Sequence, residues 1–295
     1  MSRICAIGFC FYLEKELWNS PLRIAMTNRS SCPPLYSLVL THVKLSNCHF
    51  PPSSPSFCGF QNLLSLDVSQ VTFGSEFCEI IKMSPLLEIL KIGDEDPVPM
   101  LNLSELLKLK KLKIISLPLY AIDCMDITNS LIVHGGPYLP DLEELLLSFT
   151  YPDVDVEEVI SGKLVCETFS RVKNLTLTFV DFDSSDVLPL VYEIIWGFPN
   201  LQNLTIQGLD EYEDRSIELS TSIGQLQLQN VVFENFEGSL NELLFIKKLL
   251  ACTPLLKKIT IRPDRYRHFD GHEFAESLLS FERASSIAEV DLDMS

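Results

Sequence analysis

The sequence has little positive charge and few of the residues that do chemistry. Against 40 Asp+Glu it has 23 Lys+Arg, a formal net charge of −17. A field of that sign repels phosphate backbones and anionic headgroups, so nucleic acid and membranes are poor partners. Its five histidines share no motif with a serine or cysteine nucleophile, and no phosphate-cradling glycine loop or GxSxG elbow is present. We therefore predict a non-enzyme without a cofactor; a hydrolase whose residues meet only in space stays the alternative.

Clustered cysteines and long apolar runs are also missing. The nine cysteines are scattered and form no CxxC pair, whereas a secreted disulfide framework would group them. We expect reduced thiols in an intracellular protein, nuclear or cytoplasmic. No apolar run approaches the roughly 18 residues that cross a bilayer. The stretch Ile4–Leu13 resembles the centre of a signal peptide, but charged residues follow it without a cleavage site, so we interpret it as a buried strand.

Metal-ligand patterns are equally weak. His268 and His272 are four residues apart, but Gly271 interrupts the spacing and no cysteine lies close in sequence. A zinc site needs about four such ligands. We predict a surface loop there and no metal site.

What the sequence does have is a repeated apolar-x-x-apolar-x-apolar spacing. Successive copies begin 28, 24, 25, 30, 30, 29, 27, 28 and 31 residues apart, a mean of 28, which is typical of leucine-rich repeats. The ten copies begin at Leu35, Leu63, Leu87, Leu112, Leu142, Val172, Leu201, Leu228, Leu256 and Ile287. We count Ile4-Ile7-Phe9 as an eleventh copy.

Prolines mark where five copies begin, and helical patterns lie between the copies. A proline stands two residues before the first apolar position at Pro33, Pro85, Pro140, Pro199 and Pro254. Proline ends a helix and biases its neighbour to extended geometry. Apolar residues at three- and four-residue spacing predict helices over Ser75–Met83, Leu101–Lys108, Val156–Val165, Val187–Trp196, Asn241–Ala251 and Glu273–Ala284. Asp186 and Ser239 are predicted N-caps.

These patterns together predict an α/β leucine-rich-repeat solenoid of about 10–11 repeats. A curved parallel β-sheet would form its concave face, with helices and loops on the convex face.

Two segments carry a family resemblance. Residues 33–73 (PPLYSLVLTHVKLSNCHFPPSSPSFCGFQNLLSLDVSQVTF) contain a phrase close to GFxNLxSLDLxxVxF, and residues 228–261 read LQNVVFENFEGSLNELLFIKKLLACTPLLKKITI. The first resembles the opening repeats, and the second the FBD core, of plant F-box/LRR proteins that end in an FBD domain. The resemblance implies a leucine-rich-repeat region over 1–214 and an FBD-like region continuing the solenoid over 215–295.

In that family, the F-box docks on the Skp adaptor of a ubiquitin ligase while the repeats recruit a substrate. Nothing in this sequence matches an F-box, and Asp214–Gly224 stands where the family has a Trp- and Pro-rich lead-in. The resemblance implies a recognition scaffold for a protein target of unknown identity, without Skp adaptor binding. A small-molecule-dependent co-receptor acting through the concave face is the alternative.

Residues between the apolar positions should stack into outward rows across parallel strands. The row before the central position begins at Ser37 and includes Ile89, Ile114, Glu144, Asn174, Asn203 and Asn230; the next row begins at Val39 and includes Leu146, Thr176 and Thr205. The asparagines and threonines would offer hydrogen bonds, and Ile89, Ile114 and Leu146 apolar contact, to a partner. The alternative is that these are only solvated strand residues.

Overall fold

The computed structural model describes residues 2–6, 9–13, 22–31, 41–49, 60–72, 83–93, 108–118, 141–150, 171–184, 187–209, 224–264 and 271–293. The chain divides into two compact units. Unit 1 comprises Met1–Glu143 and Tyr151–Glu157, and unit 2 comprises Glu144–Thr150 and Glu158–Ser295. The predicted boundary at 214/215 falls outside the described residues and stays a prediction.

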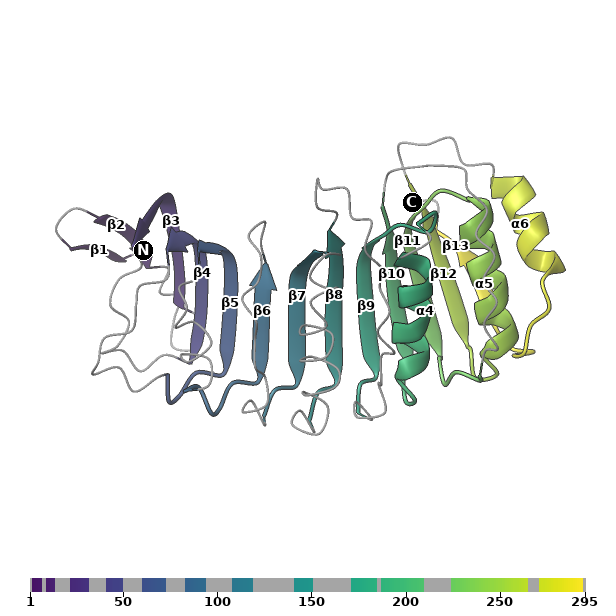
Figure 1. Cartoon of the computed structure of the whole chain (residues 1–295), viewed down its shortest axis with the longest axis horizontal. Coiled ribbons are helices and arrows are strands. Elements are labelled where there is room, and N and C mark those ends of the chain that lie inside the picture. The colour runs from purple at the N-terminus through teal and green to yellow at the C-terminus, as the bar shows by residue number, and fades with distance from the viewer. Residues whose placement is uncertain are drawn as a thin grey trace. The chain divides into compact units, whose positions relative to one another are not determined.

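Unit 1 is a stack of parallel strands preceded by a hairpin (Figure 1). The hairpin pairs β1 (Ser2–Ala6) with β2 (Phe9–Leu13) antiparallel. Each strand of the stack pairs in parallel with the next, in the order β3 (Leu22–Ser31), β4 (His42–His49), β5 (Ser65–Thr72), β6 (Ile89–Gly93) and β7 (Lys111–Pro118).

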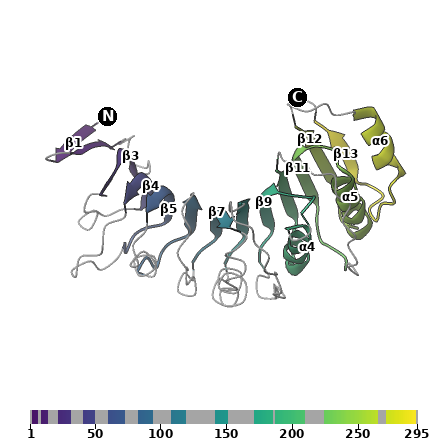
Figure 2. The ribbon, with the colours of Figure 1, turned by 45° about the horizontal axis from the view of Figure 1, so that its top comes forward.

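Unit 2 alternates parallel strands with helices. Its strands are β8 (Glu144–Thr150), β9 (Asn174–Val180), β10 (Asn203–Gly208), β11 (Asn230–Phe236), β12 (Lys258–Pro263) and β13 (Glu289–Leu292). Each pairs in parallel with the next, and the helices are α4 (Val187–Gly197), α5 (Leu240–Cys252) and α6 (Gly271–Ser280). Figures 1 and 2 both show α4 and α5 on one side of these strands. The predicted α/β leucine-rich-repeat architecture is confirmed.

The repeated apolar positions form the core between sheet and helices. In the repeat that contains β10, Leu201, Leu204 and Ile206 are at most 1% exposed. Aromatic rings fill the space against α4 and α5: Phe245 lies 5.4 Å from Phe182 and 4.9 Å from Tyr192 between ring centroids. Such rings bury large apolar areas, so this cluster fixes the helices on one side and leaves the opposite strand face to solvent.

A capping box starts α5 directly after β11. Ser239 is the N-cap, as predicted, and its hydroxyl accepts a hydrogen bond from the Glu242 N–H. The Glu242 carboxylate in turn accepts from the backbone N–H groups of Glu237, Gly238 and Ser239, at 3.2, 2.8 and 2.8 Å. Gly238 adopts φ 85° in this turn, a conformation that favours glycine. The side chain of Glu242 thus ties the end of β11 to the start of α5.

Two of the predicted copies are out of register with the strands, and a third belongs to a hairpin. The strand paired with β5 is β4, in which Val43 faces Leu66 and Leu45 faces Val68, so its pattern is Leu40-Val43-Leu45 and not the one starting at Leu35. In β7, Leu112 pairs with Leu90, which shifts the copy to Leu109-Leu112-Ile114. Leu109 and Leu112 are 0% and 2% exposed. The copy at Ile4 is instead part of the antiparallel hairpin, and β3, which pairs with β4, coincides with none of the predicted copies.

The helix predictions hold where the structure describes them, with one shortened helix. Helices α4 and α5 match within a residue or two, but α6 ends at Ser280 rather than Ala284. The N–H of Ala284 instead donates to the carbonyl of Leu250, at 2.9 Å. The residues after Ser280 therefore do not continue α6, and one of them bonds a carbonyl near the end of α5. The predicted N-cap Asp186 and almost all of the helices predicted over Ser75–Met83, Leu101–Lys108 and Val156–Val165 lie outside the described residues.

Candidate functional site

The outward strand face of unit 2 is the face opposite the helices. Along β9, Leu175 and Leu177 are buried, whereas Asn174 and Thr176 between them are half-buried. Because side chains alternate along a strand, Asn174 and Thr176 point away from the aromatic core. The same alternation in the neighbouring strands aligns equivalent residues into rows across the sheet.

An asparagine ladder, Asn174, Asn203 and Asn230, runs across β9, β10 and β11 in the first of these rows. The three residues are partners in the parallel register. The Asn203 Nδ2 donates to Asn174 Oδ1 at 2.7 Å, and the Asn230 Nδ2 donates to Asn203 Oδ1 at 2.8 Å. Both bonds run in the same direction, so the amide dipoles are aligned. Asn203 and Asn230 each use one of their two Nδ2 hydrogens in the ladder, and Asn174 takes part only through its Oδ1, so further donor and acceptor capacity stays available.

A second outward row lies beside the ladder. It contains Thr176 and Thr205, which are register partners, and continues through Val232 to Thr260. On the other side, Glu144 and Leu146 of β8 pair with Asn174 and Thr176. The predicted residues of unit 2 therefore lie side by side, with amides and hydroxyls flanked by one carboxylate and one half-buried leucine.

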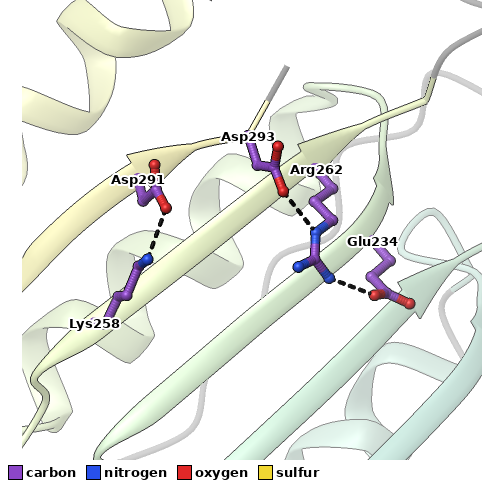
Figure 3. A network of polar contacts seen from close by, with 5 residues as sticks. All are labelled: Glu234, Lys258, Arg262, Asp291 and Asp293. Carbon is purple, nitrogen blue, oxygen red and sulfur yellow. Dashed lines mark hydrogen bonds and ion pairs between the residues drawn. The ribbon is translucent and has the colours of Figure 1, made fainter. Parts of the chain in front are cut away.

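A charged network, not anticipated from the sequence, occupies the same face at β11, β12 and β13 (Figure 3). Arg262 pairs with Glu234 at 2.7 Å and with Asp293 at 3.0 Å, and Lys258 pairs with Asp291 at 2.8 Å. The hydrogen bond that the Lys258 ammonium donates to Asp291 raises the pKa of Lys258, and those that Arg262 donates to Asp293 and Glu234 raise the pKa of Arg262. The alternation of side chains along a strand could have predicted this network. Glu234, Arg262 and Asp293 each lie two residues after a residue of the second row, and therefore on the same face.

Two β-bulges shape the ends of the ladder strands. Between matched pairs, β9 has one more residue than β10, and β11 one more than β12. At these places Phe179 and Asn235 adopt φ 58° and 53°, a conformation that asparagine tolerates and phenylalanine rarely adopts. Gly208 lies beside the second bulge, and a Cβ there would come within 2.9 Å of the Asn235 carbonyl oxygen. Glycine is therefore required for this close approach.

In unit 1, the outward row that contains the predicted residue Ile89 is made of mixed polar, charged and apolar residues. Ile89 begins β6 on the outward face, and its register partners are Ser65 and Lys111. Ile114 is the register partner of Ile92, a fully buried position of β6, and not of Ile89, so the predicted alignment of Ile89 with Ile114 was wrong. Ser37 and Val39, with which the two predicted rows begin, lie outside the described residues. On β4, the register partners of Ser65 and Asp67 are His42 and Lys44. The predicted apolar stretch therefore does not form as a single row.

Amide, hydroxyl and charged side chains make up this face among the described residues. Within them no group of three or more His, Cys, Asp or Glu is arranged to hold a metal ion. No described helix has both the length and the apolar composition needed to cross a membrane. What the outward face of unit 2 offers chemically is directional amide and hydroxyl hydrogen bonding next to paired charges.

No protein-family model matches the chain. A comparison with curated proteins finds an F-box/FBD/LRR-repeat protein of Arabidopsis thaliana that is 25% identical, over 76% of this chain. The predicted resemblance to plant F-box/LRR/FBD proteins is confirmed. The chain spans 60% of the length of this relative. Together with the repeat architecture, the relationship supports a general role in protein interaction.

Proposed function

We propose that the outward strand face of unit 2 recognises a protein target, in the manner of the target-binding part of an F-box/LRR/FBD adaptor. The asparagine ladder is the observation that carries the proposal. Three aligned amides on a rigid sheet, at 2.7 and 2.8 Å from one another, hold their spare donors and acceptors at fixed positions. A partner that binds them need not order these side chains, which lowers the entropy cost of association.

The geometry favours a polar segment of a protein as the target. The ladder and the threonine row give a periodic set of donors and acceptors spaced by about 4.8 Å from strand to strand. An extended polypeptide crossing the strands can meet these groups with its own backbone and amide side chains. Leu146 and the half-buried Val232 add apolar contact at the margins, so the surface mixes the two kinds of contact that protein interfaces use.

The direct test is capture of the target by the full chain and by a triple variant, Asn174→Ala, Asn203→Ala and Asn230→Ala. Glu193→Ala serves as the control, because Glu193 is exposed on α4, across the sheet from the ladder. Proximity labelling with the native chain and with Glu193→Ala should return the same discrete partner, and the triple variant should lose it. Equal labelling by all three chains, with the triple variant folded, would contradict the proposal.

The link to a ubiquitin ligase is a separate part of the proposal. The described residues would supply target recognition only, so a purified Skp adaptor should not bind the chain in a pull-down, while the captured target should. A stable complex with the Skp adaptor would show that the chain carries an adaptor-docking surface of its own.

A further inference from the structure

Among the described residues, β13 is the last strand of unit 2, and its edge away from β12 is open, with no described strand paired to it. Its described sheet neighbour is β12. The N–H groups of Glu289 and Asp293 donate to the carbonyls of Lys257 and Ile261, both at 2.9 Å. In a parallel ladder, alternate residues bond toward opposite sides. The N–H and C=O groups of Val290 and Leu292 therefore face the open edge, where another strand could pair with them.

The apolar positions of this last repeat are also incompletely covered. In the preceding repeat, Leu256, Ile259 and Ile261 are at most 1% exposed. Their counterparts are Ile287, which is 70% exposed, and Val290 and Leu292, which are half-buried. In a solenoid each repeat buries its apolar residues against the next one. Among the described residues, nothing takes that place beside β13.

The charges on the outward face alternate from strand to strand toward this edge (Figure 3). Acidic Glu234 on β11 pairs with basic Arg262 on β12, and Arg262 pairs with acidic Asp293 at the end of β13. The acidic residues Glu289, Asp291 and Asp293 stand at every second position, so they share one face. A further strand beside β13 would continue this pattern if it were basic at alternate positions.

We propose that the open edge of β13 binds an extended segment of a partner protein that carries Lys or Arg at alternate positions and apolar residues between them. The backbone of the segment would pair with Val290 and Leu292, its basic side chains would meet the acidic row, and its apolar side chains would cover Ile287. This is recognition by strand addition, in which the edge supplies affinity and the alternating side chains supply specificity. The site is distinct from the asparagine ladder.

Charge argues for this occupant over a second copy of the chain. Two β13 edges brought together would place like-charged rows against each other, in a protein with a net charge of −17. Like charges directly opposite on paired strands are destabilising. A basic segment instead gains from the same field.

The test uses the full chain and a fluorescent peptide of about nine residues, in which Lys and Val alternate. Two control peptides replace every Lys by Glu or place Pro at the centre, since proline cannot donate to a strand ladder. We expect the Lys–Val peptide to bind saturably and the two control peptides not to bind. Slower hydrogen exchange at the amides of Val290 and Leu292 should accompany it, because these N–H groups become bonded. Binding without that protection, or no binding, would overturn the proposal.

Two variants of the chain make the test specific to the edge. Val290→Pro removes an edge-facing N–H but none of the N–H groups that pair with β12, and Glu289→Lys reverses one exposed charge of the acidic row. Each should weaken the Lys–Val peptide about tenfold while leaving capture of the ladder target unchanged. Unchanged peptide affinity in a folded Glu289→Lys would overturn the proposal. So would a concentration-dependent dimer that Val290→Pro abolishes, since it would assign the edge to a second copy.

Discussion

The outward strand face of unit 2 has two regions that place polar groups side by side in different ways. The asparagine ladder uses neutral amides, bonded in one direction across β9, β10 and β11. The charged network uses opposite charges, paired across β11, β12 and β13. The side chains of Lys258 and Arg262 are 47% exposed, whereas Asn174 and Asn203 are half-buried. Water screens exposed ion pairs strongly, so the ladder should contribute to stability more than the network does.

The largest expected effect comes from Glu242→Ala, which disturbs both regions at once. Glu242 is 3% exposed and holds the turn that follows β11, the strand shared by the ladder and the network. Without the carboxylate, N–H groups in the turn lose their acceptor, at about 1–3 kcal/mol for each group left buried. We expect a fall of about 3 kcal/mol in the free energy of unfolding, measured in urea. A loss well under 1 kcal/mol would show that the turn does not depend on Glu242.

Glu242 also predicts a pH dependence of stability. Burial raises the pKa of its carboxyl from 4.5 to about 7, against the opposing effect of the backbone N–H donors of Ser239, Glu237 and Gly238. A carboxyl with a raised pKa in the folded state binds more protons there than in the unfolded chain. Its contribution to stability is therefore full below about pH 4.5 and is lost as the pH rises through about 7. Glu242→Gln should lack this component, so the difference in unfolding free energy between the two proteins should change across that range.

Gly208→Ala should have the next largest effect, because it forces apart the strands on which the ladder is built. The added Cβ would meet the Asn235 carbonyl oxygen at 2.9 Å, whereas a Cβ at Gly224 would meet nothing within 4 Å. We expect a loss of about 2 kcal/mol at Gly208 and nearly none at Gly224. Equal melting temperatures for the two variants would contradict the close approach at the β11 bulge.

The loss of unfolding free energy caused by each single substitution in the ladder should follow the number of hydrogen bonds that the residue makes. Asn203 takes part in two amide bonds, and Asn174 and Asn230 in one each. At about 1 kcal/mol per bond, Asn203→Ala should cost roughly twice what Asn174→Ala costs. Adding Asn230→Ala to Asn203→Ala should then cost little more, because their shared bond is already gone. Fully additive losses would mean that the amides act independently.

The smallest expected effect is in the charged network. Lys258→Ala and Arg262→Ala should change the melting temperature by little at low salt and not at all at about 0.5 M NaCl, where the screening length is only a few ångströms. The ladder variants should show the same loss at both salt concentrations. A large, salt-resistant loss in Arg262→Ala would remove the distinction between the two regions.

How much the sequence could predict differs between the two units for a physical reason. In unit 2, the frames chosen for the copies agree with the register of the paired strands, and the ladder rows followed directly from them. In unit 1, the apolar pattern fits two overlapping frames, Leu35-Leu38-Leu40 against Leu40-Val43-Leu45, and Leu112-Ile115-Leu117 against Leu109-Leu112-Ile114. Burial of Leu109 and Val43 decides between them. A pattern of apolar residues does not contain that information when both frames are apolar.

The hydrogen bonds and ion pairs of the outward face lay beyond sequence reasoning. The row of asparagines was visible, but the direction of its amide bonds depends on side-chain rotation. The pairing of Arg262 with Glu234 occurs beside a bulge. Asn235 gives a weak signal for that bulge, and Phe179 gives none for the other.

The most direct test of the ladder as the recognition surface is the affinity of the captured target for Asn203→Ala and Arg262→Ala, measured by titration calorimetry against the native chain. We predict a target affinity at least about tenfold weaker for Asn203→Ala, because a buried partner group would lose its hydrogen bond, and an unchanged affinity for Arg262→Ala. Full affinity in a folded Asn203→Ala would contradict the account, and a loss confined to Arg262→Ala would assign recognition to the charged network instead.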